Sequence, residues 1–165
     1  MKSFTVLKTD DTCKARAGVL KTFHSEIQTP VFMPVGTIGT VKAVEQRELD
    51  EMDASIILGN SYHLYLRPGS DVLKSAGGLH KFMNWNKSLL SDSGGFQVFS
   101  LKLLRKVKED GVEFSSHIDG SKHFFSPEKV IDTQRIIGSD IMMPLDICLQ
   151  NPSEYKDNER ALELT

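Results

Sequence analysis

The stretch "LLSDSGGFQVFS", residues 89–100, places an apolar run directly before a carboxylate, two glycines and two aromatic side chains. This order is typical of a buried strand that delivers an acid, Asp92, to a functional site. The Gly94-Gly95 pair that follows has no side chains and would let a flat ligand approach the backbone. The stretch therefore predicts a sheet that carries chemistry at the end of a strand.

Three more apolar segments share this character, and helical patterns separate them. The four predicted buried strands are "VFMPVG" (31–36), "SIILGN" (55–60), "SLLSDS" (88–93) and "DIMMPLD" (140–146). Helices are predicted within residues 40–52, 67–78 and 126–138, and a last helix is predicted to begin at a Ser153 N-cap. Because strands and helices alternate, we expect an α/β fold with parallel strands. Either an open doubly wound sheet or part of a (β/α)8 barrel fits.

The rest of the chain suggests two additions to this α/β unit. Residues 1–30 contain three short segments with polar turns, which predict a small antiparallel β-sheet. Residues 31–165 then form the α/β part of a single structural domain. Within it, residues 102–125 are predicted to be an inserted hairpin, with turn signals at Asp110-Gly111 and Asp119-Gly120.

Composition restricts the class of protein only loosely. The 165 residues are 39% apolar with a net charge of −2, which is ordinary for a globular domain and neither indicates nor excludes a nucleic-acid partner. No apolar run is long enough for a membrane span, and the N-terminus lacks the pattern of a signal peptide. Cys13 and Cys148 suggest neither a disulfide framework nor a self-contained zinc site, so we expect a cytoplasmic protein.

Two acids are the main candidates for chemistry. Asp92 and Asp146 each end a predicted parallel strand, so both would face the same edge of the sheet. A pair of carboxylates there can perform acid/base work, bind a metal, or accept the adjacent N–H donors of a guanine-like ring. The alternative is that each aspartate only bonds the local backbone at a strand end.

Further side chains could complete such a site. Phe96 could stack on a heteroaromatic ring or belong to the core, and Gln97 could pair with an amide edge. Asn60 follows the second strand and could bond a ribose or phosphate. His117, Asp119 and His123 raise the possibility of a metal site, but a solvated turn explains them better, so no metal ligand is predicted.

The motifs together resemble a known family. "TPVFMPVGT", "LGNSYHLYLRPG", "LLSDSGGFQVFS" and "FSSHIDGSKHFFSPEKVIDTQRIIGSDIMMPLD" occur in the order found in the N-terminal part of bacterial tRNA-guanine transglycosylase, the queuine tRNA-ribosyltransferase family. The resemblance implies the N-terminal portion of a (β/α)8 TIM-type barrel preceded by a small antiparallel sheet. It also implies a cytoplasmic homodimer. The implied reaction exchanges the wobble guanine of a tRNA with a GUN anticodon for 7-aminomethyl-7-deazaguanine, in queuosine biosynthesis.

The resemblance also assigns roles to residues. Asp92 corresponds to the acid that contacts the base and performs acid/base catalysis, Asp146 to a second base-recognising acid, and Asn60 to a tRNA contact. The other implied substrate-binding residues are Ser93, Gly94, Gly95, Phe96 (a stacking aromatic), Gln97 and Cys148. Ile147 departs from the acid common at its position, which bears on base selectivity.

The resemblance places other parts of the family's machinery beyond the equivalent of Thr165. These are the nucleophilic aspartate and a zinc site of three cysteines and one histidine. We therefore expect a fragment with the base-recognition half of the enzyme, no nucleophile and no cofactor or metal of its own, inactive alone. Two alternatives are a non-catalytic partner subunit or scaffold of the same family, and an unrelated barrel hydrolase with paired aspartates and a metal.

Overall fold

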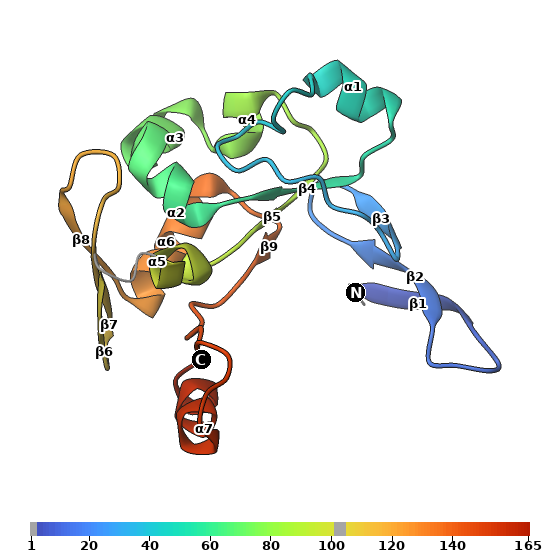
Figure 1. Ribbon diagram of the computed structural model, residues 1–165. Helices are drawn as coiled ribbons and strands as arrows, with labels where there is room; N and C mark the ends of the chain where they lie inside the picture. Colours follow the sequence, from blue (N-terminus) through green and yellow to red (C-terminus); the bar gives the residue numbers. More distant parts are fainter. Residues whose placement is uncertain (1–2, 101–104) are drawn as a thin grey trace.

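The computed structural model describes residues 3–100 and 105–165 (Figure 1). Within these ranges the strands form three separate three-stranded sheets. A parallel sheet occupies the middle of the molecule, and the N-terminal sheet and the hairpin sheet lie on opposite sides of it. The predicted mixed α/β fold with a small antiparallel sheet is confirmed. The division of the chain at residue 30 stays a prediction.

The N-terminal sheet consists of β1 (Phe4–Thr9), β2 (Arg16–Lys21) and β3 (Glu26–Thr29), paired antiparallel in that order. Gly18 in β2 is required by its neighbour, because a Cβ there would lie 2.5 Å from the ring of Phe4. Ile27 is the residue of β3 that is buried, with 1% of its surface exposed. The sheet therefore attaches to the rest of the protein through β3 and the turn before it.

The central sheet has the order β4 (Ile56–Gly59), β5 (Ser88–Ser91) and β9 (Ile141–Met142), and all pairs are parallel. The register sets Gly59 opposite Ser91. The predicted strands at 55–60 and 88–93 are thus confirmed with slightly shorter bounds. Both are apolar and buried, as expected for strands covered on two faces.

The prediction of fully buried strands at residues 31–36 and 140–146 is wrong. Residues 31–36 make one bridge, Val35 to Leu58, while Phe32 is 83% exposed. Pro30 and Pro34 have no N–H to donate, so a longer ladder cannot form there. Residues 140–146 pair over β9 alone, because the Met143 N–H is already bonded to the Gln134 side chain.

The helices of the first part of the chain are short. They are α1 (Gln46–Glu51), α2 (Ser61–Leu64), the π-helical η1 (Tyr65–Gly69), α3 (Ser70–Ala76) and α4 (Leu79–Met83). The helix predicted across 40–52 begins only at Gln46, since Ala43 has a positive φ of 62° and the Glu48 carboxylate accepts from the Glu45 N–H. The predicted 67–78 helix is confirmed in α3.

Three helices follow the third strand. They are α5 (Gly95–Ser100), which the sequence did not predict, α6 (Pro127–Ile137) and α7 (Tyr155–Leu164). In α6 the Ser126 hydroxyl accepts from the Lys129 N–H, and Gly138 ends the helix in the left-handed conformation, as predicted. The predicted N-cap of α7 is wrong by one residue, because Glu154 occupies that position.

The predicted hairpin is a three-stranded antiparallel sheet of β6 (Arg105–Lys108), β7 (Gly111–Ser115) and β8 (Lys122–Phe125). Its turns lie at the two predicted Asp-Gly pairs, and residues 102–104 of the prediction fall outside the described residues. A core formed by Tyr62, Val98, Val112, Phe114, Phe125 and Val130 joins this sheet to α2, α5 and α6.

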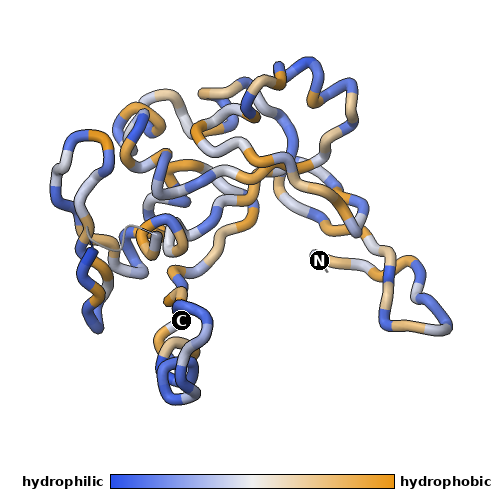
Figure 2. The backbone as a smooth tube through the Cα atoms, in the orientation of Figure 1, coloured by the Kyte–Doolittle hydropathy of each residue, from blue (hydrophilic) through white to orange (hydrophobic). Residues whose placement is uncertain are grey.

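A second core packs α1, α3 and α4 against β4 and β5. Its members are Leu49, Ile57, Leu64, Leu73, Leu79, Met83, Trp85, Leu89 and Ile137. In Figure 2 the chain is largely apolar along the central strands, and α7 carries many hydrophilic positions. No helix within the described ranges is long and apolar enough to cross a membrane.

Changing Ser126 to alanine tests the capping assignment. The Lys129 N–H would lose its acceptor, so Ser126→Ala is expected to lower the free energy of unfolding by about 1 kcal/mol in urea titrations. Ser153→Ala, one position before the N-cap of α7, is the matched control: its hydroxyl accepts from the exposed Asn158 side chain at 2.8 Å but from no backbone N–H, so the free energy of unfolding should change by less than about 0.5 kcal/mol. Equal losses in both variants would contradict these two assignments.

Candidate functional site

The site forms around Asp92, directly after β5. Its N–H extends the parallel ladder to Gly59 O at 3.2 Å, which fixes the backbone at the end of the sheet. Its carboxylate accepts from the Ser61 N–H at 2.9 Å and the Gly94 N–H at 3.1 Å through Oδ1. The Asn60 side chain donates to Oδ2 at 2.5 Å. Asp92 is therefore held by three donors.

Burial of Asp92 raises the pKa of its carboxyl above the ordinary 3.8, and the charge of Asp146 raises it further. The hydrogen bonds from Ser61 and Gly94 lower the pKa but do not cancel these effects. The Asp92 carboxyl thus stays protonated to a higher pH in the folded state than in the unfolded state. Asp92 accordingly contributes less stability as pH rises from its unfolded pKa through its folded pKa.

Asp146 lies close to the turn after β5 although 54 residues separate it from Asp92 in the chain. The Ser93 hydroxyl donates to its Oδ1 at 2.8 Å, and the Cys148 thiol donates to its Oδ2 at 3.1 Å. A Cβ on Gly95 would lie 2.5 Å from Asp146 Oδ1, so only glycine lets the carboxylate pack against this backbone. The structure therefore brings the two predicted acids into one cluster.

Asn60 has a role that the sequence did not reveal. It is 5% exposed, donates to Asp92 and, as the N-cap of α2, accepts from the His63 N–H at 3.1 Å. Both ends of its amide are thus engaged inside the protein. The geometry makes Asn60 a positioning residue for Asp92, and the tRNA contact stays a prediction.

Phe96 and Gln97 lie on α5 and differ in burial. Phe96 is 64% exposed, and its ring is 6.5 Å from that of Phe99. Gln97 Oε1 is buried and has no hydrogen-bond partner among the described residues. The stacking role of Phe96 and the ligand contact of Gln97 stay predictions, although an unpaired acceptor is what a ligand N–H would require.

A cavity of about 590 Å³ adjoins Asp146. Asp146 and Cys148 line it beside Gly95, and Val98 and Leu145 contribute to the apolar part of the lining. The other polar or charged lining residues are Arg105, Lys108, Glu109 and Gln150, whereas Asp92 does not line this cavity. Ile147, the departure from the family pattern, also lines it. Such a cavity is in the size range of small-ligand sites.

The hairpin residues considered for metal binding do not converge. His117 bonds the Tyr62 hydroxyl at 2.8 Å, whereas His123 bonds the Tyr65 hydroxyl at 3.0 Å. Asp119 caps the local turn by accepting from Ser121. Among the described residues, the group whose ligand atoms do come together is His24, His80 and Asp140, which no sequence motif indicated.

Parallel strands with two acids and a glycine turn beyond their carboxyl ends define an α/β protein with a candidate ligand site at the edge where such folds carry one. The model of one family, described as queuine tRNA-ribosyltransferase, matches residues 10–165. The chain belongs to the queuine tRNA-ribosyltransferase family.

Individual relatives agree with this assignment. Proteins named queuine tRNA-ribosyltransferase from Caldanaerobacter subterraneus subsp. tengcongensis and Dictyoglomus turgidum are 62% and 54% identical over 162 residues, which is 98% of this chain. The same alignments cover 43% and 42% of those relatives. The chain therefore spans less than half the length of the curated relatives it matches.

Cys148 is expected to be a poor nucleophile. Burial, followed by the hydrogen bond and charge of Asp146, raises the pKa of its thiol to about 11. At pH 8 only about one thiol in a thousand would be ionised, so iodoacetamide should modify Cys148 far more slowly than exposed Cys13. Mass spectrometry of the two peptides measures this, and Asp146→Asn should speed the reaction of Cys148. Equal rates of modification of Cys148 and Cys13 in the protein without substitutions would contradict the raised pKa of Cys148.

Substitution of Asn60 separates its two roles. Asn60→Ser keeps an acceptor for the N-terminus of α2 but replaces the amide donor to Asp92 with a hydroxyl on a shorter side chain, whereas Asn60→Ala removes both acceptor and donor. The alanine variant should therefore unfold with about 1 kcal/mol less free energy than the serine variant. NMR titration of the Asp92 carboxyl should show a further raised pKa in both. An unchanged pKa would contradict the positioning role.

Proposed function

We propose that this chain carries the base-recognition part of a tRNA-guanine transglycosylase, which exchanges wobble guanine in tRNA for 7-aminomethyl-7-deazaguanine in queuosine biosynthesis. The observation that carries the proposal is the clustering of Asp92 and Asp146 around the Ser93–Gly95 turn. Family membership supports the same reaction, since the relatives are named for ribosyl transfer on tRNA.

The acids suit the recognition of a purine. Each oxygen of Asp146 accepts one internal hydrogen bond, from Ser93 or from Cys148, and a carboxylate oxygen has two lone pairs. One acceptor site on each oxygen thus remains for the adjacent N–H donors on the Watson–Crick edge of a guanine-like ring. Ser93 and Cys148 hold the carboxylate in place, so little ordering is needed when the base binds.

Asp92 suits proton transfer. In the proposed reaction an aspartate forms a bond to the ribose anomeric carbon while the bond to guanine breaks, and the incoming base then displaces that aspartate. Two inversions retain the configuration. The departing guanine takes up a proton and the incoming base gives one up. A carboxyl whose pKa is raised by burial can carry that proton nearer to neutral pH.

The strand order supports the N-terminal portion of a (β/α)8 barrel over an open doubly wound sheet. Val35, β4, β5 and β9 are neighbours in the order in which they occur along the chain. A barrel requires this sequential order, whereas doubly wound sheets reverse it at a switch point. The site lies at the carboxyl ends of the strands, where barrel enzymes place their chemistry.

The zinc site implied by the family is part of the proposal and is expected outside this stretch of sequence. Cys13 is exposed in the β1–β2 connection and Cys148 donates to Asp146, and among the described residues the group of converging ligand atoms contains neither. The mechanism above takes no step through zinc. The resemblance places both zinc and the nucleophile beyond the equivalent of Thr165. A homodimer, a cytoplasmic location and a tRNA contact at Asn60 remain part of the proposal.

A non-catalytic partner subunit or scaffold of the same family is the second candidate. The ordered Asp92 and Asp146 network disfavours it, since a scaffold has no need of two restrained acids. The metal-dependent hydrolase is disfavoured by the three donors on Asp92, which occupy acceptor positions that a metal would use.

Calorimetry with guanine and 7-aminomethyl-7-deazaguanine tests base recognition. We expect binding by this chain, weakened at least about tenfold in Asp146→Asn, because an amide presents one acceptor where the base requires two. Asp132→Asn, at an exposed pair with Arg135 on α6, is the matched control and should bind normally. No binding, or equal binding by Asp146→Asn, would overturn the proposal.

An exchange assay with labelled guanine and tRNA separates recognition from catalysis. The chain alone is expected to bind the base but to incorporate no label, because the proposed nucleophile is not among its residues. Incorporation would show that one of its own residues attacks the sugar.

A further inference from the structure

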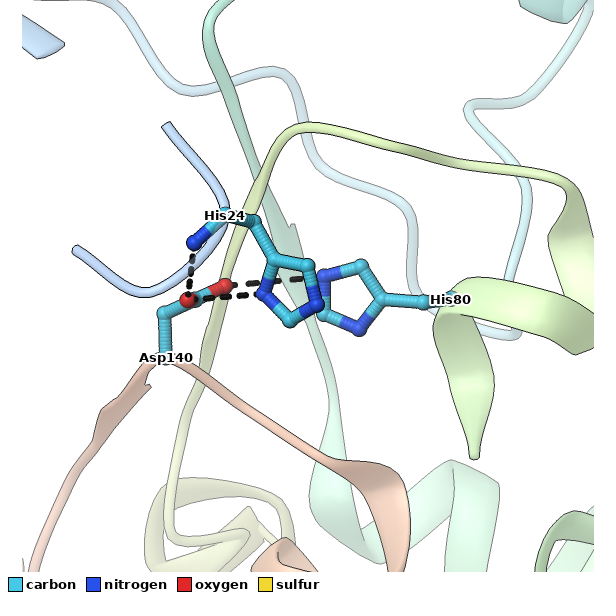
Figure 3. Close-up of side chains that lie close together, drawn as sticks. All are labelled: His24, His80 and Asp140. Atoms are coloured by element: carbon cyan, nitrogen blue, oxygen red, sulfur yellow. Dashed lines mark hydrogen bonds and ion pairs between the residues drawn. The ribbon is translucent and has the colours of Figure 1, made fainter. Parts of the chain in front are cut away.

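A second polar cluster lies at the opposite, amino ends of the central strands. His24 belongs to the turn between β2 and β3, His80 lies on α4, and Asp140 directly precedes β9 (Figure 3). The turn contacts the start of β5 as well, because the Ser88 hydroxyl bonds those of Thr22, at 2.7 Å, and Ser25. The cluster therefore joins the N-terminal sheet to the α/β body.

Asp140 is the centre of the cluster. Its side chain has no exposed surface and accepts from the Leu89 N–H at 2.9 Å through Oδ2. Its Oδ1 accepts from both the backbone N–H of His24 at 3.2 Å and the ring Nδ1 at 2.8 Å. His80 Nε2 lies 3.5 Å from Oδ2. One buried negative charge thus faces two imidazole rings.

The two rings are stacked on each other. Their centroids are 3.7 Å apart with an interplanar angle of 19°. This geometry does not suit a shared metal, because an imidazole binds a metal in its own plane and two nearly parallel stacked planes do not meet at one nearby point. The donor atoms are also engaged, since His80 Nε2 bonds the Lys87 carbonyl at 3.0 Å. The arrangement instead suits the uptake and release of protons by the two rings.

We propose that His24, His80 and Asp140 form a proton-operated clasp, which holds the N-terminal sheet on the body near neutral pH and loosens it in acid. When neither ring carries an extra proton, the His24 Nδ1–H donates to the Asp140 carboxylate and the two stacked rings tolerate each other. Protonation of both rings in acid sets two positive charges face to face against a single carboxylate. Separation of the sheet from the body relieves that repulsion.

The other charged groups nearby pair with partners outside the cluster and do not neutralise the two rings. The Lys87 ammonium points to Asp50 and Asp53, at 3.4 Å and 3.7 Å. On the sheet side, Lys21 and Glu26 pair with each other at 2.6 Å. The charges that act on His80 are those of His24, which opposes its protonation, and Asp140, which favours it.

The direction of the pH effect follows from burial. Burial first, and His24 second, lower the pKa of His80 below its ordinary 6.5. As pH falls through 6.5, His80 takes up a proton in the released or unfolded form but stays neutral in the docked form until a lower pH. Docking therefore weakens between that pH and the lower pKa of the docked state, and each pKa unit of difference corresponds to about a tenfold loss.

Hydrogen–deuterium exchange of the chain measures docking directly. After correction for intrinsic rates, protection of the amides in β1–β3 should fall from about pH 7.5 to about pH 5. Protection in β4 and β5 should change less. Loss of protection in all strands together, or in none, would overturn the proposal.

His80→Gln is the decisive variant. It removes the second charge but can still donate to the Lys87 carbonyl, so the N-terminal sheet should stay protected at about pH 5. His123→Gln, in the hairpin sheet, is the matched control and should open in acid like the unmodified chain. His24→Gln should raise the pKa of His80, measured by NMR titration of its ring.

Two results would refute the clasp. Acid opening in His80→Gln as large as in the unmodified chain would show that another group controls docking. Stoichiometric binding of Zn²⁺ or Ni²⁺ that is lost in both His24→Gln and His80→Gln would make the cluster a metal site instead.

Discussion

The register of two short parallel strands determines the geometry of the site. Gly59 of β4 pairs with Ser91 of β5, so both chains leave the sheet at the same level. Asn60 and Ser61 then begin α2 directly beside Asp92, and the acid accepts from both. A shift of this register by one residue would turn Asp92 toward the opposite face and leave the N-terminus of α2 without its partner.

The two ends of the same strands have different physical properties. At the carboxyl ends, backbone N–H groups and small side chains surround two acids, of which Asp146 borders a cavity. At the amino ends, a turn from a distant sheet closes over Ser88 and Asp140 through dense side-chain hydrogen bonds. The first arrangement leaves acceptors available to a ligand, and the second satisfies its own. The central strands thus separate the two candidate acids from the attachment of the N-terminal sheet.

The sequence was informative where local pattern and final geometry coincide. Asp92 and Asp146 could be expected together because carboxyl ends of parallel strands share an edge, and the Ser126 cap followed from local residue types. Residues 31–36 misled because an apolar run does not reveal how prolines limit pairing. The cluster of His24 and Asp140 could not be foreseen, since 116 positions separate the two residues and no pattern links them.

The packing of Gly95 against Asp146 limits how this pocket can change. Any side chain at position 95 would meet a carboxylate oxygen at 2.5 Å, so that wall cannot be remodelled without moving the acid. Ile147 lines the same cavity from the next residue along. That side of the cavity therefore depends on glycine, whereas Ile147 contributes a side chain whose size affects the room beside Asp146.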